Sequence, residues 1–340
     1  MLFMMSHFYK KCRKIFLILF LQKMQGKEDM SMSQLYEKAR NYLYRNARPL
    51  NIARFQYHFE NGSKEAVLTA LSFYQNKDGG FGHGLEADSW NPNSAPVQVQ
   101  TAINILIEID FEEKEHPIIQ GILSFLESGK CFNGHFWYTG LKSNNDYPHA
   151  PWWFSEENGP WNGDDYNPTA ALAGFVVYFA DKGSVLYETG CRIVKEAYNQ
   201  LIFGKRKNDM HTISCYIQML DYLKRAKETE LVDLLVLEVA LRRIVNVSIT
   251  QDKEKWEGGY ICKPSQYFHS KDSIFYQDNR EIADYECTFI RKAQLEDGSY
   301  TVPWNWENYS EEWAVSKVRW KCEITLLNLL YLKGMGIILN

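Results

Sequence analysis

Two short segments with the same residue spacing constrain the fold of this chain most strongly. Gln75-Asn76-Lys77-Asp78-Gly79-Gly80-Phe81 and Gln294-Leu295-Glu296-Asp297-Gly298-Ser299-Tyr300 share the positions of a glutamine, an aspartate, a glycine and an aromatic residue. Weaker copies occupy residues 134–137 and 256–260. A single pair of helices cannot bury its apolar face alone, so internal repeats of this kind indicate a solenoid or a closed ring.

Apolar residues recur at helical spacing almost throughout the chain. Leu35, Ala39 and Leu43 share one face, and Ser63 is expected to cap a helix that continues to Tyr74. Few windows alternate with period two for long enough to predict a strand. The sequence therefore predicts an all-α protein, with further helices at residues 97–109, 117–126, 169–179, 185–201, 213–223, 231–247, 282–293 and 315–332.

Each strong copy of the repeat has the residues of a turn between packed helices. Gly79 and Gly298 suit a backbone position with positive φ just beyond a helix end. The aspartate before each glycine can accept hydrogen bonds from nearby amides, and the glutamine can reach a neighbouring helix. The aromatic residue that follows is expected to fill the gap to the next helix pair. These features favour a structural role for the repeat.

The two copies resemble the glutamine–tryptophan-type repeat of the terpenoid cyclase and protein prenyltransferase superfamily, also called squalene cyclase-like. The stretch Gly-Gly-Phe-Gly-His-Gly-Leu-Glu-Ala-Asp at residues 79–88 is similar to one that recurs in uncharacterised single-toroid bacterial proteins. The resemblance implies an α/α toroid, an α6/α6-type barrel of inner and outer helices. It predicts one toroid domain over residues 32–340, after a leader or appendage over residues 1–31. Such a fold does not by itself carry a function.

The chemistries that the resemblance implies are matched only in part. Class II cyclases protonate an alkene with the middle acid of Asp-x-Asp-Asp-Thr-Ala, which aligns with Asp165-Tyr166-Asn167-Pro168-Thr169-Ala170. Asn167 takes the place of that acid and cannot donate a proton as a carboxylic acid does. Neither the Asp-Asp-x-x-Asp of magnesium-dependent ionisation nor the Asp-x-Cys of zinc prenyltransferases occurs in the sequence, so no metal and no cofactor is expected.

Five titratable side chains are the candidates for catalysis. His83, Glu86 and Asp88 follow the first turn closely, and Asp164 and Asp165 precede an expected helix. Grouped acids and histidines on a loop can transfer protons or bind a cation. Such residues can equally hold the loop itself together, by accepting amide hydrogen bonds and donating to carbonyl groups.

Most tryptophans lie in two stretches that are expected to connect helices. Eight of the ten fall within residues 137–161 and 304–320. Aromatic rings in such loops either pack beneath them or line a cavity, where they stabilise a cation or stack on a sugar ring. The candidate ligand-binding residues are aromatic side chains of these stretches and of the two turns, namely Phe81, Trp137, Trp152, Trp153, Tyr300, Trp304 and Trp306.

Composition limits the partners and the compartment. A net charge of -4 gives no basic surface for nucleic acid. The apolar run at residues 15–21 is shorter than the ~18 residues of a membrane span, and no small-residue cleavage site follows it. Seven scattered cysteines without a Cys-x-x-Cys pattern are typical of a reducing compartment, so a cytoplasmic protein is expected. The oligomeric state is left open.

Three functions remain open at this point. The resemblance favours a protein that binds or converts a hydrophobic, isoprenoid-like small molecule in a central aromatic cavity, and leaves open whether it is an enzyme. A carbohydrate-active toroid is the first alternative, and would need two carboxylates about 5–10 Å apart across a groove. A non-catalytic scaffold that binds a peptide is the second, and would show an exposed apolar rim.

Overall fold

The computed structural model describes residues 31–163, 165–205 and 207–338. Within these ranges the chain forms eleven α-helices and no strand, which confirms the all-α prediction. Of the expected leader, only Ser31 lies inside the described residues. The helices are α2 (Met32–Asn46), α3 (Pro49–Phe59), α4 (Lys64–Ser72), α5 (Pro96–Glu108), α6 (Pro117–Glu127), α7 (Thr169–Phe179), α8 (Val185–Phe203), α9 (Met210–Ala226), α10 (Leu234–Ser248), α11 (Arg280–Ala293) and α12 (Ser310–Gly334).

Short polar side chains begin many of these helices. Ser31 and Gln34 form a capping box at the start of α2, and Ser63 accepts a hydrogen bond from the third residue of α4. Asp209 accepts from two backbone amides at the start of α9. The helices predicted from apolar spacing are all present, and α3 is the one that the spacing did not predict.

The glutamine of each strong repeat joins its turn to a neighbouring helix, as predicted. Nε2 of Gln75 donates to the carbonyl oxygen of Ile118 in α6 at 3.2 Å. Nε2 of Gln294 donates to the carbonyl oxygen of Leu35 in α2 at 3.0 Å. Each amide also donates to a carbonyl inside its own turn, at 3.0 and 3.1 Å. The two copies of the repeat are therefore equivalent in structure as well as in sequence.

The glycine of each turn is required by both conformation and space. Gly79 has a φ of +84° and Gly298 a φ of +94°, so both lie in the left-handed region. A Cβ at Gly79 would lie 1.9 Å from the carbonyl oxygen of Gly121, and one at Gly298 would lie 2.1 Å from that of Lys38. The backbone of each turn thus packs directly against the backbone of a neighbouring helix, α6 for Gly79 and α2 for Gly298.

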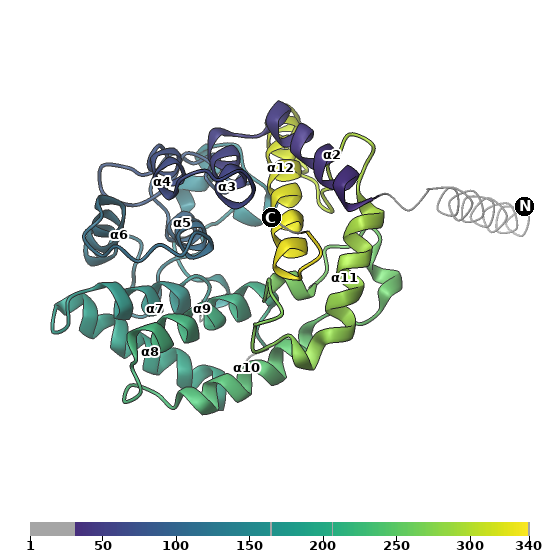
Figure 1. Ribbon diagram of the computed structural model, residues 1–340. Helices are drawn as coiled ribbons and strands as arrows, with labels where there is room; N and C mark the ends of the chain where they lie inside the picture. The colour runs from purple at the N-terminus through teal and green to yellow at the C-terminus, as the bar shows by residue number, and fades with distance from the viewer. Residues whose placement is uncertain (1–30, 164, 206, 339–340) are drawn as a thin grey trace, which may run out of the picture.

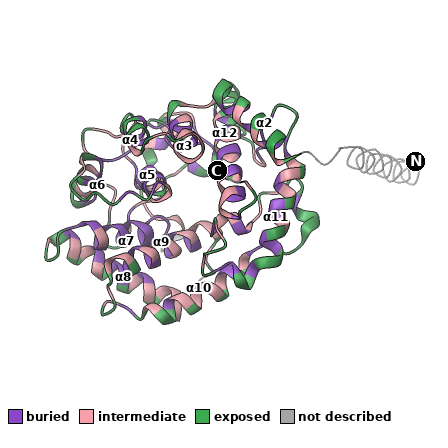
Figure 2. Ribbon diagram, in the orientation of Figure 1, coloured by how far each residue is buried: buried purple, intermediate pink, exposed green. Residues whose placement is uncertain are grey.

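The end of the chain packs against its beginning. Helix α12 contacts both α2 and α3, and Figure 1 shows the yellow C-terminal helix beside the purple N-terminal helices. Helix α7 packs against α6, α8 and α9, and all but one of its residues are buried. Among the exposed residues in Figure 2 are those along the outer sides of α10 and α11. A continuous apolar core joins residues of every helix from α2 to α12.

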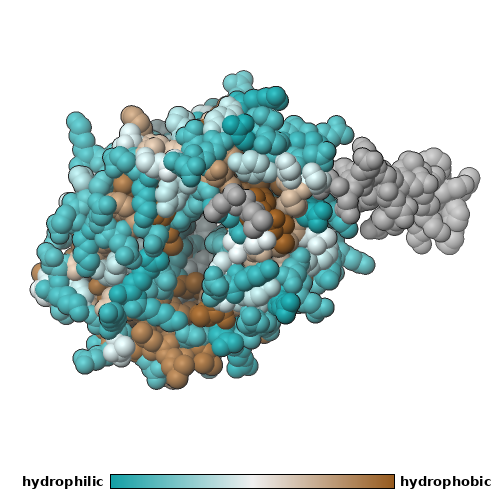
Figure 3. Space-filling view, in the orientation of Figure 1, coloured by the Kyte–Doolittle hydropathy of each residue, from teal (hydrophilic) through white to brown (hydrophobic). Residues whose placement is uncertain are grey.

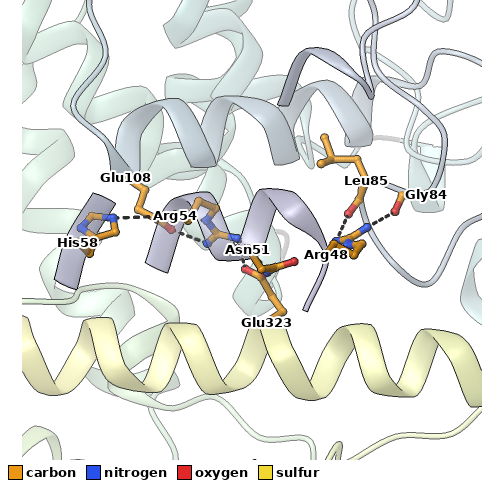
Figure 4. Close-up of polar contacts among 8 residues, drawn as sticks. All are labelled: Arg48, Asn51, Arg54, His58, Gly84, Leu85, Glu108 and Glu323. Carbon is orange, nitrogen blue, oxygen red and sulfur yellow. Dashed lines mark hydrogen bonds and ion pairs between the residues drawn. The ribbon is translucent and has the colours of Figure 1, made fainter. Parts of the chain in front are cut away.

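A buried cluster of charges connects α3, α5 and α12. Arg54 is 3% exposed and bonds to Glu108 of α5 at 2.5 Å and to Glu323 of α12 at 2.8 Å (Figure 4). Burial alone would raise the pKa of Glu108, but the charge of Arg54 and the hydrogen bonds of His58 and Arg54 lower that pKa to about 2. The cluster therefore fixes the last helix to the first ones by ionic contacts.

Helix α10 carries exposed apolar side chains on its outer side. Leu235, Val239 and Val247 of α10 are 71%, 58% and 75% exposed, and a brown patch lies over α10 at the lower edge of Figure 3. The same view shows the face hollowed near its middle. None of the helices that the structure describes combines the length and the apolar character needed to cross a membrane.

Candidate functional site

The two tryptophan-rich stretches meet in space. Trp153, Trp306 and Trp313 are buried in a satellite cluster that is separate from the main core. Four further tryptophans pack against them, so seven of the ten tryptophans belong to this tryptophan cluster: Trp90, Trp153, Trp161, Trp304, Trp306, Trp313 and Trp320. Its members come from the α4–α5 connection, the α6–α7 connection, the α11–α12 connection and α12 itself.

The rings of the tryptophan cluster are held in fixed mutual orientations. Trp306 stacks on Trp313 at 5.5 Å, and Trp304 meets Trp320 edge-on at 5.0 Å. Nε1 of Trp90 donates to Oγ of Ser316 in α12 at 2.8 Å. Contacts of these kinds restrict ring rotation, so the indole N–H groups keep defined directions.

Asp88 lies at the centre of several of these indoles. Its side chain is 2% exposed, and Nε1 of Trp306 donates to Oδ1 at 2.7 Å. Burial raises the pKa of Asp88 to about 6, although the N–H groups of Trp306, Trp320 and Trp304 lower it. Asp88 is therefore a carboxyl group that changes its protonation state close to neutral pH.

Glu86 is a second carboxyl group in the same place. Burial raises its pKa well above the ordinary value, and the charge of Asp88 raises it further. Its Oε2 is buried and makes no hydrogen bond to any residue that the structure describes. Two adjacent carboxyl groups of this kind share protons, because the ionisation of one disfavours that of the other.

The connection before α7 holds the backbone of this acid pair. The amide of Ala150 donates to the carbonyl oxygen of Asp88 at 2.8 Å, and the amide of Trp90 donates to that of Pro148 at 3.0 Å. On the other side, the amide of Glu86 donates to Oε1 of Gln98 in α5 at 2.8 Å. Two separate elements thus position the carboxyl groups.

Tyr260, which contacts His211, lies close enough to the acid pair to feel its charge. The Tyr260 hydroxyl lies 2.9 Å from Nε2 of His211, and its ring meets that of Trp304 edge-on at 5.4 Å. Burial raises the pKa of Tyr260, and the charges of Glu86 and Asp88 raise it further. Tyr260 is nevertheless 55% exposed, so part of its side chain is open to solvent.

The histidine of this pair is neutral at physiological pH. Burial lowers the pKa of His211, although Asp209 raises it. His211 belongs to no predicted site in the sequence, and Tyr260 stands there only at the end of a weak copy of the repeat. No local pattern connects either residue with Glu86 and Asp88, so the sequence alone offered no signal for this pairing.

Several of the predicted ligand-binding residues lie elsewhere. Phe81 and Tyr300 are 0% and 4% exposed and belong to the main core. Trp137 also lies there, stacked on Phe132 at 4.8 Å. Trp152 is 39% exposed at the surface. Of the seven predicted aromatic residues, Trp153, Trp304 and Trp306 are the ones that join the tryptophan cluster.

Among the remaining predicted catalytic residues, His83 and Asp165 form hydrogen bonds with residues other than Glu86 and Asp88. His83 is exposed and its Nε2 lies 2.8 Å from Oδ1 of Asn76, within the same turn. Asp165 is buried and accepts from the amide of Asn167 at 2.9 Å and from Oγ1 of Thr212 in α9 at 2.8 Å. These contacts give Asp165 a role in fixing the start of α7 against α9. Asp164 lies outside the described residues.

The chemistry open to this site is proton exchange beside aromatic surfaces. Across the part of the chain that the structure describes, no group of three His, Cys, Asp or Glu side chains could hold a metal ion. The comparisons with known proteins add no relative: no protein-family model, no curated protein and no solved structure matches this chain. The function is therefore argued from the geometry of the site.

Proposed function

We propose that this protein is an α/α toroid of the terpenoid cyclase-like kind that binds a hydrophobic small molecule against the tryptophan cluster. Support for the toroid comes from α12, which returns to pack on α2 and α3, and from α7, which is buried as an inner helix would be. The equivalent glutamine turns add to that support, because they repeat the same contact between successive helix pairs.

The observation that carries the proposal is the pair of carboxyl groups beneath the indoles. Burial raises the pKa values of both Glu86 and Asp88, so the pair keeps a proton to higher pH than ordinary carboxyl groups do. A protonated carboxyl donates to a reacting atom, and its ionised neighbour can accept a proton back. The indole faces supply apolar contact area and stabilise positive charge that develops on the ligand.

This assignment differs from the standard class II arrangement. Asn167 occupies the place of the acid in that motif, and its Oδ1 faces the thiol of Cys215 at 3.6 Å. The proton donor in this protein is instead the acid pair Glu86 and Asp88. The Tyr260 hydroxyl and Nε2 of His211, 2.9 Å apart, offer a second pair of groups that can exchange a proton.

One observation favours a carbohydrate as the second candidate ligand. The Asp88 pKa of about 6 is in the range of the general acids of glycosidases, which protonate a glycosidic oxygen. Tryptophan and tyrosine faces also stack on sugar rings, so the same wall serves both ligands. The two candidate functions therefore use the same residues and differ in the ligand that is bound.

Tryptophan fluorescence separates these candidates, because Trp304, Trp306 and Trp320 report directly on the site. We expect farnesol to quench the emission saturably, and Glu86→Gln and Asp88→Asn to weaken that binding or change its pH dependence. Glu127→Gln, an exposed acid at the end of α6, is the matched control and should behave as the native protein. Binding of cellotetraose in place of farnesol would support the second candidate. Failure of both probes, or equal effects of all three variants, would overturn the proposal.

A further inference from the structure

Two arginines flank the loop that carries the acid pair. Nη1 of Arg48 donates to the carbonyl oxygen of Gly84 at 2.7 Å, and Nη2 donates to that of Leu85 at 3.0 Å (Figure 4). Nη1 of Arg319 in α12 lies on another side of the same loop, 3.6 Å from the position that a Cβ of Gly84 would take. A side chain at Gly84 would therefore begin in van der Waals contact with the Arg319 guanidinium.

Arg319 rests on the tryptophan cluster. Its guanidinium carbon lies 4.9 Å from the ring centre of Trp90, in cation–π contact. The Trp90 ring is fixed in turn by Ser316, whose Oγ accepts from Nε1 at 2.8 Å and donates to the carbonyl oxygen of Ala87 at 2.8 Å. A guanidinium supported in this way has few rotamers to lose when it binds a ligand.

Neither arginine is neutralised. Among residues 31–163, 165–205 and 207–338, no carboxylate lies at ion-pair distance from Arg48 or Arg319, and Arg319 makes no hydrogen bond to a protein group. Burial lowers the pKa of Arg319, and the nearby charge of Arg48 lowers it further. Two half-buried like charges without an anion are costly, and the guanidinium of Arg319 keeps its donors unused.

We propose that Arg319, stacked on Trp90 and subject to the like charge of Arg48, binds an anionic group of the ligand, either a carboxylate or a phosphate. This inference rests on the proposed function, because it makes the ligand amphipathic: its charged end meets Arg319, and its apolar body covers the tryptophan cluster. A planar guanidinium binds both kinds of oxygen anion through two parallel hydrogen bonds.

Binding of decanol, decanoate and decyl phosphate at constant ionic strength tests this inference by tryptophan fluorescence. We expect at least one anion to bind about tenfold or more tightly than decanol, as a charge-assisted bidentate contact implies. The tighter of the two anions identifies carboxylate or phosphate. Arg319→Gln should remove the preference and keep decanol binding, Arg319→Lys should retain part of it, and Arg243→Gln, an exposed arginine of α10, should retain all of it.

The outcomes distinguish this inference from the proposed function. Equal binding of decanol and both anions by the native protein would overturn the anion site and leave the hydrophobic site standing. If decanol does not bind but inorganic phosphate or acetate gives a response that depends on Arg319, the hydrophobic site would be overturned and the anion site would stand. A preference for anions that survives in Arg319→Gln would also refute the assignment, because the charge would then come from another residue.

Discussion

Replacement of Asp88 by asparagine removes a buried titrating group with little change of shape. The amide oxygen of asparagine can still accept the hydrogen bond that Nε1 of Trp306 donates to Asp88 at 2.7 Å. The carboxyl is 2% exposed, so solvent does not screen its interactions appreciably. The substitution therefore isolates the effect of protonation at this position.

The magnitude follows from the difference in pKa between the two states of the protein. Asp88 titrates at an ordinary 3.8 in the unfolded chain and at about 6 in the folded one. Between these values the folded protein keeps a proton that the unfolded chain has lost. The contribution to stability is therefore complete below pH 3.8 and is lost as the pH rises through 6. A shift of about 2 pKa units corresponds to about 3 kcal/mol.

The assay compares urea unfolding of the native protein and Asp88→Asn by circular dichroism from pH 4 to pH 8. We expect the free energy of unfolding of the native protein to fall by about 3 kcal/mol more than that of the variant. Loss of the Asp88 charge also reduces the pKa of Glu86, which changes the result in the same direction. Trp306→Phe removes a hydrogen-bond donor that lowers the Asp88 pKa. In this variant the pH at which Asp88 loses its proton should therefore lie above 6.

Parallel unfolding curves would refute this reasoning. If the native protein and Asp88→Asn differ by a constant free energy across pH 4 to 8, Asp88 does not retain its proton in the folded state. The acid pair would then be an ordinary ionised pair, and the proposed proton exchange would lose its basis.

Two further predictions concern the scaffold, and both are measured as changes in the urea unfolding midpoint. Gly79→Ala should destabilise the protein by about 3 kcal/mol, because alanine is strained in the left-handed conformation and its Cβ clashes with α6. Gly129→Ala should cost about 1 kcal/mol, because Gly129 also has a positive φ of +69° but lies in open space. Equal losses in the two variants would contradict the close packing of the turn. Arg54→Met should cost about 3–5 kcal/mol because it leaves two buried carboxylates unpaired. Arg242→Met, which breaks an exposed pair, should cost below about 1 kcal/mol, and a similar loss in both would contradict the buried role of Arg54.

The helices and the repeated turns could be predicted because their causes are local. In α6, Ile118, Ile122 and Phe125 place an apolar face at regular spacing, and no polar residue interrupts it. The glycine and aspartate of each turn likewise act on their own backbone. Helix α3 escaped prediction because Asn51 and Arg54 point inward, 1% and 3% exposed, and break the apolar pattern of its buried face.

The candidate site could be predicted only where its residues are neighbours in the chain. Glu86 and Asp88 were recognised because two acids lie within three residues on one loop. Trp90 and Trp320 were not assigned to the site, because the first stands apart from both tryptophan-rich stretches and the second lies within a helix. Their meeting depends on tertiary packing, which periodicity does not encode.

The same connections explain how the scaffold and the site depend on each other. Helix α3 begins next to Arg48, which holds the loop of the acid pair. Six residues after Arg48 it carries Arg54, which binds Glu323 of α12. Helix α12 also carries Trp313 and Trp320 of the tryptophan cluster. The acid pair therefore receives its aromatic wall only when the last helix docks on the first ones. A change at Arg54 that loosens this contact should alter the Asp88 pKa as well as the stability, although Arg54 belongs to a separate cluster.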